Sequence, residues 1–462
     1  MASAPEYPPQ VTLLLASPYH LALDPMEVEA GKPYPPLGPL VSAAELLALG
    51  HDVRLYDATF ARDMEPFQLA LAGHRPTRVA LVADPHAVAV KMCTTAQREA
   101  TCAMVAAAKA AGAAVLVAGP DPTDHPEPYE AAGADVVVAG EHDGALRDFA
   151  AGTLPSGRAP RRPNRHDLAQ LPDPAWDLVD LPAYANRWRS KHNRWELNLS
   201  TARGCPYRCN WCAKPTWGRA YATTTPERAA ELVRGAQARG ADAAWFTDDI
   251  FAVKPAWLRA FRQALAGAPL PFRCNTRADL VRDGAYVHDL AAAGCHEVWM
   301  GAESGSDRVL AAMDKDQTRA DLDAAVARLR DAGIRVGFFL QLGYPGETRA
   351  DVLATVAMIR RLRPDEIGVS VSYPLPGTAF HDRVAADLRR ANWTSSMDNE
   401  VLFAGTYPQA FYDAVRELLR AEHAWLSFRP SLSRGGIRRA AALPYHAARW
   451  PVHRAKVAVL GR

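Results

Sequence analysis

Short apolar runs of strand length alternate with helical patterns along most of this chain. In the first 150 residues the runs lie at 11–15, 53–55, 79–82, 115–117 and 136–138, with helix-like stretches such as 41–49 and 96–111 between them. Strands that alternate with helices form parallel sheets covered by helices. Gly50, Gly112 and Gly133 each stand just before a strand, where a helix is expected to stop. We therefore expect an α/β fold that begins with a Rossmann-like domain over residues 1–150.

The same alternation resumes at residue 195. Candidate strands lie at 195–200, 243–246, 272–275, 297–300, 335–340 and 367–371, and helical segments at 226–239, 257–266, 319–332 and 349–362. Successive βα units of this kind predict a partial TIM barrel, (β/α)6, over residues 195–380. Chemistry on such a scaffold belongs at the carboxyl ends of the strands.

Two segments show no such alternation. Residues 151–194 are rich in Pro, Arg and Asp and have no sustained period, which predicts a linker. Residues 381–462 predict a small helical region around 411–424, followed by a basic tail with eight Lys or Arg and no acidic residue from 428 onward. A solvated tail is the simplest interpretation of that charge. A groove for an anionic substrate and a contact with a membrane surface remain open.

Composition excludes several classes of protein. The chain has 462 residues and a formal net charge of +2, so no global field favours nucleic acid as a partner. Its first residues lack the basic start and apolar run of a signal peptide. No stretch approaches the roughly 20 apolar residues that span a bilayer. The seven cysteines do not suggest a disulfide framework. We expect a cytoplasmic protein without a transmembrane segment.

Three of the cysteines lie within eight residues, directly after the first expected barrel strand. The segment reads Arg203-Gly-Cys205-Pro-Tyr-Arg-Cys209-Asn-Trp-Cys212. Thiolates are the usual ligands of iron–sulfur clusters, which ordinarily take four, so three cysteines leave one iron open to a substrate. One apolar face of a helix is an alternative, although the glycine, proline and asparagine in the segment disfavour it. A zinc site completed by Cys274 or His192 is another.

The C-x-x-x-C-x-x-C segment resembles that of the radical S-adenosylmethionine (SAM) superfamily, including the aromatic Trp211 before the last cysteine. The resemblance implies a 4Fe–4S cluster held by Cys205, Cys209 and Cys212. It also implies that the open iron chelates the amino and carboxylate groups of SAM, whose reductive cleavage gives a 5′-deoxyadenosyl radical.

Further segments resemble the same family in the expected order. Asp248 and Asp249 end the second barrel strand, where the family contacts the amino group of SAM; a helix N-cap is the alternative. Arg277, after the third strand, is a candidate partner of the methionyl carboxylate, because guanidinium matches carboxylate geometry. A surface arginine is the other interpretation.

The fourth and fifth strands end in two more such segments. Gly301-Ala-Glu303-Ser304-Gly resembles the family's G-x-E-S-G, which implies that Glu303 and Ser304 lie near the cofactor. A carboxylate can accept both ribose hydroxyls. Gly343-Tyr-Pro-Gly-Glu347-Thr resembles a G-x-P-G-E-T turn, so Gly343 is a further cofactor-binding candidate. Pro-Gly is also ordinary turn chemistry.

The N-terminal domain resembles that of the cobalamin-binding subgroup, as in Tyr34-Pro-Pro-Leu-Gly38, GHDVRLYD (50–57) and Gly140-Glu141. Ligands of open α/β sheets bind at the carboxyl ends of the strands. The pattern D-x-H-x-x-G is absent; Asp84-Pro-His86 is the nearest text, so the lower cobalt ligand is unassigned. No G-x-G-x-x-G occurs, which argues against a nicotinamide cofactor. Segments 368–380 and 403–412 look similar to the anaerobic magnesium-protoporphyrin monomethyl ester cyclase branch.

The resemblance to the cobalamin-binding subgroup implies a cobalamin-dependent radical SAM methyltransferase that acts on an unactivated carbon of a small specialised metabolite. A reducing partner such as flavodoxin or ferredoxin is then expected. A radical oxidative cyclase or rearrangement enzyme with the same cofactors is the first alternative. A non-catalytic cobalamin- or metal-binding sensor is the second, and the intact cysteines and Glu303 weigh against it.

Overall fold

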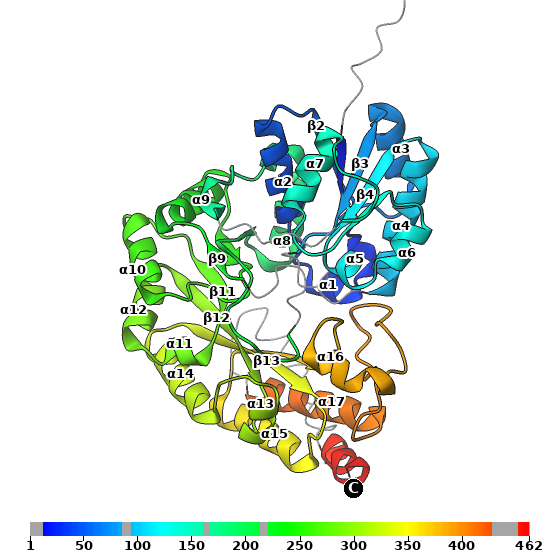
Figure 1. The fold of residues 1–462 in the computed structure, drawn as a ribbon. Coiled ribbons are helices and arrows are strands. Elements are labelled where there is room, and N and C mark those ends of the chain that lie inside the picture. The colour runs from blue at the N-terminus through cyan, green and yellow to red at the C-terminus, as the bar shows by residue number, and fades with distance from the viewer. Residues whose placement is uncertain (1–12, 86–93, 160–166, 213–219, 427–450, 462) are drawn as a thin grey trace, which may run out of the picture. The chain divides into compact units, whose positions relative to one another are not determined.

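The computed structural model describes residues 13–85, 94–159, 167–212, 220–426 and 451–461 (Figure 1). The chain divides into two compact units by its internal contacts. Unit 1 comprises residues 1–206, 213–248 and 392–398, and unit 2 comprises residues 207–212, 249–391 and 399–462. Each unit is described by itself.

Unit 1 begins with a parallel sheet in the order β2-β1-β3-β4-β5-β6. All five predicted strands are present, together with one that was not predicted: β1 Leu13–Ser17, β2 Val53–Asp57, β3 Arg78–Val82, β4 Ala114–Ala118, β5 Val136–Val138 and β6 Gly157–Ala159. Its helices are α1 Pro25–Ala30, α2 Leu37–Ala48, α3 Glu65–His74, α4 Thr95–Ala110, α5 Pro120–Asp124, α6 Glu127–Ala131 and α7 Asp143–Ala151. The direction of winding changes between β1 and β3, the kind of point where open α/β sheets bind ligands.

Both faces of this sheet are buried. Leu13 and Leu15 pack into one core cluster, whereas Leu14 and Ala16 pack into the other. Because no face meets water, β1 is a continuous apolar run instead of an alternating one. The predicted helix stops are also confirmed, since Gly50, Gly112 and Gly133 adopt positive φ angles of 86°, 82° and 102°.

The segment predicted to be a linker, 151–194, is more ordered than its composition suggests. Its described residues include β6, two short 3₁₀ turns at Leu168–Gln170 and Trp176–Leu178, and helix α8 Leu181–His192. Asp180 caps α8 by accepting a hydrogen bond from Ala183 N. Trp188 is buried, and its indole donates to the Pro33 carbonyl at 2.8 Å. Few apolar residues of α8 face the core, so its period was too weak to detect.

All six strands predicted for the barrel are present, two of them in unit 1 and four in unit 2. In unit 1 these are β7 Glu196–Leu199 and β10 Ala243–Phe246, with the hairpin β8 Ala202–Arg203 and β9 Ala222–Thr223 and helix α9 Pro226–Ala238. In unit 2 they are β11 Phe272–Thr276, β12 Cys295–Glu303, β13 Arg335–Leu342 and β14 Glu366–Val371. The pairs β7–β10, β11–β12, β12–β13 and β13–β14 are parallel, as the partial barrel requires.

Helices follow the strands of unit 2 on one side of its sheet (Figure 1). They are α10 Pro255–Ala264, α11 Ala278–Val281, α12 Gly284–Ala292, α13 Asp307–Ala312, α14 Arg319–Asp331 and α15 Arg349–Leu362, followed by α16 Ala379–Val384, the 3₁₀ turn Ala385–Asp387 and α17 Gln409–Leu426. Helix α17 confirms the predicted helix at 411–424. Most of the basic tail lies outside the described residues.

A short segment of the predicted C-terminal region belongs to unit 1 instead. Residues 392–398 lie against the N-terminal sheet domain, where Thr95 N donates to the Trp393 carbonyl at 2.9 Å. Ser396 donates to Asp24. Among the described helices, none has the length and apolar character needed to cross a bilayer.

Candidate active site

The chain enters the cysteine segment from β7 through a tightly held turn. Ser200 Oγ, Thr201 N and Ala202 N all donate to Asp248 Oδ1, at 3.0, 2.7 and 2.9 Å. Thr201 Oγ1 donates to the second carboxylate oxygen. Asp248 is 1% exposed, and burial raises its pKa to about 6 although these hydrogen bonds lower it. The carboxylate therefore fixes the backbone that leads to Cys205.

Asp248 and Asp249 were both predicted to contact a cofactor amino group. Since Asp248 already accepts bonds with both oxygens, the structure gives it a positioning task. Asp249 is half-buried and lies in unit 2.

Cys209 lies beside a buried cation in unit 2. Arg277 Nη1 is 3.9 Å from Cys209 Sγ, and its guanidinium lies 3.8 Å from the centre of the Tyr207 ring. Its other nitrogens donate to Asp279 at 2.8 Å and to the Lys315 carbonyl at 2.8 Å. Burial opposes its charge, but Asp279 and the Cys209 thiol raise its pKa. The Cys209 thiol therefore lies beside a buried positive charge.

Glu303 pairs with a residue that the sequence did not single out. Lys315 Nζ donates to Glu303 Oε1 at 2.9 Å, and both side chains are more than nine-tenths buried. The Lys315 ammonium also lies 5.9 Å from the centre of the Trp211 ring. Burial lowers its pKa, but Glu303 and Cys209 outweigh that effect and raise it. No motif marks Lys315, which follows α13 in the sequence.

The glycines of the G-x-E-S-G segment make room for this pair and for a helix. A Cβ on Gly301 would lie 2.2 Å from Glu303 Oε1 and 2.5 Å from Lys315 Nζ. A Cβ on Gly305 would lie 2.4 Å from the backbone oxygen of Ala354 in α15. Ser304 is fully buried, and its hydroxyl accepts from Ser306 N at 3.2 Å. Ser304, a predicted cofactor-binding residue, thus holds the turn.

Gly343 turns the chain after β13 with a φ of 77°. Its N–H donates to Glu347 Oε2 at 2.6 Å, while Glu347 Oε1 has no hydrogen-bond partner among the described residues. Glu347 is 2% exposed, and burial raises its pKa to about 8. A Cβ on Gly343 would lie 3.2 Å from the Tyr412 ring. The carboxyl of Glu347 is therefore a buried group that carries a proton near neutral pH.

Gly38, from a segment of the cobalamin-type resemblance, is bonded to Asp84 at the carboxyl edge of the first sheet. Asp84, after β3, accepts from Gly38 N at 3.2 Å, and a Cβ on Gly38 would lie 2.9 Å from the same oxygen. His86 falls outside the described residues. His20, after β1, is buried; its Nδ1 lies 2.9 Å from the Pro18 carbonyl, and burial lowers its pKa.

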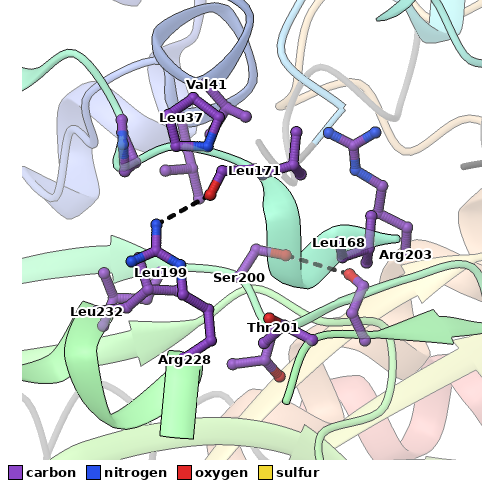
Figure 2. A pocket seen from close by; sticks show the side chains of 14 residues that line it. Leu37, Val41, Leu168, Leu171, Leu199, Ser200, Thr201, Arg203, Arg228 and Leu232 are labelled. Carbon is purple, nitrogen blue, oxygen red and sulfur yellow. Dashed lines mark hydrogen bonds between the residues drawn. The ribbon is translucent and has the colours of Figure 1, made fainter. Parts of the chain in front are cut away.

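A small pocket lies in unit 1 beside the turn at 199–203 (Figure 2). Its walls come from α2, from the 168–174 segment and from α9, and its floor is the turn at 199–203. Most of its lining is apolar. Figure 2 shows Arg203 at its rim and Arg228 on the opposite wall. The pocket is bounded by the same turn that Asp248 holds.

The three thiols fit a cluster by the chemistry of the donor set. None of Cys205, Cys209 and Cys212 forms a disulfide; Cys205 is buried and the other two are half-buried. Within the described ranges, no group of three or more His, Cys, Asp or Glu side chains is gathered as a metal site. Cys274 and Cys295 are buried in strands of unit 2.

Part of the chain matches a known protein family. Residues 199–359 match the model of the radical SAM superfamily. An uncharacterized methyltransferase of Pyrococcus horikoshii is 26% identical over 388 residues, which are 78% of this chain and 81% of that protein. A bacteriochlorophyllide d C-12(1)-methyltransferase of Chlorobaculum tepidum is 21% identical over 43% of this chain and 44% of its own length.

Two solved structures share the fold. The radical SAM methyltransferase TsrM of Kitasatospora setae, with cobalamin and a [4Fe-4S] cluster bound, has a TM-score of 0.66 at 19% identity, over 82% of this chain and 75% of TsrM. The cobalamin-dependent SAM radical enzyme OxsB, with aqua-cobalamin bound, has a TM-score of 0.68 at 14% identity, over 95% of this chain and 72% of OxsB.

Residues 199–359 form a radical SAM domain, in which the cysteine segment follows the first strand of a half-barrel sheet. The chain is therefore a radical SAM enzyme, as the spacing of its cysteines predicted.

The close approach at Gly305 predicts a stability defect. Gly305→Ala should lower the free energy of unfolding by about 1–3 kcal/mol, because the added methyl overlaps the α15 backbone. Urea denaturation measures the change. Gly284→Ala is the matched control, since a Cβ there meets no atom within 4 Å, and it should stay within about 0.5 kcal/mol of wild type. Equal effects of the two variants would contradict the packing argument.

Buried Glu347 predicts a dependence of stability on pH. Its pKa rises from 4.5 to about 8 on folding, so its contribution is complete below pH 4.5 and is lost as the pH rises through about 8. Unfolding should become easier over that window by at most about 1.4 kcal/mol per pH unit. Glu347→Gln should flatten this slope in urea titrations from pH 5 to 8. The exposed Glu65→Gln should keep it, and an unchanged slope in Glu347→Gln would refute the assignment.

Proposed function

We propose that this chain is a cobalamin-dependent radical SAM methyltransferase that acts on an unactivated carbon of a small molecule. The observation that carries the proposal is the cysteine segment itself: three thiols without disulfides, in a matched radical SAM domain, with buried cations beside Cys209. The methyltransferase names of relatives and the fold shared with TsrM support the choice of reaction.

The thiols of Cys205, Cys209 and Cys212 hold a 4Fe–4S cluster in this proposal. When bound, the cluster and the corrin supply the electron that cleaves SAM and the methyl group that is transferred. The protein's own task is to position these groups and exclude water. Asp248 fixes the entry to the cysteine segment, and Arg277 and Lys315 place positive charge beside Cys209.

Lys315 is a better candidate for the methionyl carboxylate than Arg277. Each of the three nitrogens of Arg277 already donates to a partner: Asp279, Cys209 or the Lys315 carbonyl. Lys315 Nζ carries three donors, and its hydrogen bond to Glu303 uses one of them. We assign the carboxylate to Lys315 and the ribose hydroxyls to Glu303. The methionyl carboxylate would then accept from the Lys315 ammonium, which already pairs with Glu303.

Cobalamin is assigned to the first sheet domain. Ligands of open parallel sheets bind where the winding changes direction, here between β1 and β3. TsrM and OxsB, whose fold this chain shares, are described with cobalamin bound. The lower cobalt ligand is left unassigned, and the domain boundaries 1–150, 195–380 and 381–462 remain proposals.

The substrate is proposed to be a small specialised metabolite, with an electron donor such as flavodoxin or ferredoxin. The structure of TsrM with tryptophan substrate bound supports a small-molecule substrate for this chain. A radical cyclase or rearrangement enzyme is the second candidate. It is favoured by the resemblance of segments 368–380 and 403–412 to a cyclase branch.

Anaerobic reconstitution with iron, sulfide and hydroxocobalamin tests both cofactors in one chain. We expect about four iron and four sulfide per chain, as a single 4Fe–4S cluster requires. Cys205→Ala should lose them, whereas the matched control Cys274→Ala should keep them because that thiol lies within β11. Corrin absorption retained after desalting, with methyl transfer from methyl-labelled SAM to a metabolite extract, supports the full proposal.

Other results would contradict separate parts of it. A cluster without retained corrin would overturn the cobalamin assignment and leave the radical enzyme. Label that stays on SAM while 5′-deoxyadenosine forms with an oxidised or rearranged product would favour the cyclase. A loaded cluster that forms no 5′-deoxyadenosine in any extract would favour the sensor.

The assignment of Lys315 predicts a specific loss of SAM affinity. Lys315→Met should weaken SAM binding by about 30-fold or more, since removal of one partner of a buried, hydrogen-bonded charge pair costs about 2–5 kcal/mol. Equilibrium binding to the reconstituted protein measures it. Arg335→Met is the control, because it removes a partly exposed cation that pairs with Glu297 and Glu366. Unchanged affinity in Lys315→Met with an intact cluster would move the carboxylate elsewhere.

A further inference from the structure

A buried ion cluster joins the cysteine segment to the first sheet domain. Arg203 stands two residues before Cys205, and its side chain is 6% exposed. Its Nη1 donates to Asp143 Oδ2 at 2.6 Å and to Glu141 Oε1. Both carboxylates are 4% exposed, and all three residues belong to unit 1. We call this group the Arg203 cluster.

The partners of Arg203 come from the carboxyl edge of the first sheet. Glu141 follows β5, and Asp143 is the first residue of α7. Arg203 is the last residue of β8 and pairs with Ala222 of β9. The Arg203 cluster therefore ties the edge at which we place the corrin to the strand that leads into Cys205.

The contribution of the Arg203 cluster to stability does not by itself explain why these charges are buried. Burying charges costs several kcal/mol per ion, and well-packed apolar residues of similar volume often stabilise a fold as well or better. Here two carboxylates face one guanidinium. The positive end of α7 also favours the charge of Asp143, which is the first residue of that helix. In the structure both carboxylates accept from the same guanidinium nitrogen, Nη1.

The Arg203 cluster fixes the last residue of the turn before Cys205. Asp248 accepts bonds from Ser200, Thr201 and Ala202, and Arg203 is the next residue. Gly204, with a φ of 77°, then reverses the chain into Cys205. Each residue from 200 to 203 is thus fixed by a buried carboxylate, although regular structure covers only two of them. A cysteine that follows such a turn inherits its position from these anchors.

We propose that Arg203, held by Glu141 and Asp143, is a positioning residue for Cys205, which is a ligand of the iron–sulfur cluster. The inference rests on the proposed function in treating Cys205 as a ligand. Outer groups that orient metal ligands typically change metal affinity by about 10- to 100-fold when they are removed. Arg203 is such an outer group: it acts on Cys205 through the backbone of Gly204 and is not itself a metal ligand.

The test replaces the whole Arg203 cluster, because removal of one partner would leave buried charges unpaired and could unfold the chain. The variant is Arg203→Met/Glu141→Gln/Asp143→Asn. The control is Arg98→Met/Asp121→Asn, which removes a similarly buried pair with bonds of 2.6 and 2.7 Å elsewhere in unit 1. Circular dichroism and thermal unfolding verify that both variants fold.

Two measurements separate positioning from structure. In the reconstituted protein we expect iron to be lost to a chelator about 10-fold or more faster in the triple variant, with a broadened spectrum of the reduced cluster, and at the wild-type rate in the control. In the protein without iron, alkylation followed by mass spectrometry should label Cys205 about 10-fold faster in the triple variant, again unlike the control. Arg203→Lys should fall between the wild type and the triple variant in both.

The outcomes distinguish this inference from the proposed function. If the triple variant folds and matches the wild type in chelation and in Cys205 labelling, the positioning role is overturned. If the control shows the same changes, the effect is one of general stability and the inference also fails. If the wild type binds no iron but Cys205 labelling still rises only in the triple variant, the proposed function fails while the positioning of Cys205 by Arg203 stands.

Discussion

The carboxylate of Asp248 is the contact on which the candidate site depends. It lies at the end of β10 and accepts hydrogen bonds from three consecutive residues of the turn that follows β7. Withdrawing a carboxylate from water is costly unless several donors replace the water, and here four do so. The balance remains slightly unfavourable, since burial still raises the pKa of Asp248 to about 6. In return, four hydrogen bonds to one carboxylate hold the turn that leads to Cys205.

The G-x-E-S-G segment shows a second way in which backbone and charge are matched. Glu303 adopts a φ of 55°, an unusual conformation for a residue with a side chain. This turn directs its carboxylate to Lys315, and the absence of a side chain at Gly301 leaves space for both groups. Gly305 then lets the chain pass against the backbone of α15. Packing therefore explains both glycines of the motif: Gly301 leaves space for the ion pair, and Gly305 leaves space for α15.

The strands could be predicted from the sequence, whereas the roles of the site residues stay predictions. All eleven expected strands are present, because buried parallel strands leave continuous apolar runs and the glycines at helix ends mark their limits. Helix α8 was missed because few of its side chains, such as Tyr184 and Trp188, face the core. Lys315 was missed for a different reason: its importance comes from Glu303 and Trp211, which only the fold brings near it. Asp248 and Ser304 were found, yet their hydrogen bonds serve the backbone.

Charge explains why these supporting groups are ionic and not apolar. A segment of three thiols becomes a set of anions when it binds metal, and an apolar surrounding would oppose that change. Arg277 and Lys315 supply buried positive charge beside Cys209, but a lone buried cation would itself be unstable. Asp279 and Glu303 keep those cations charged. Each buried cation beside Cys209 is thus paired with a carboxylate of its own, and these pairs explain why the surroundings of this cysteine are ionic.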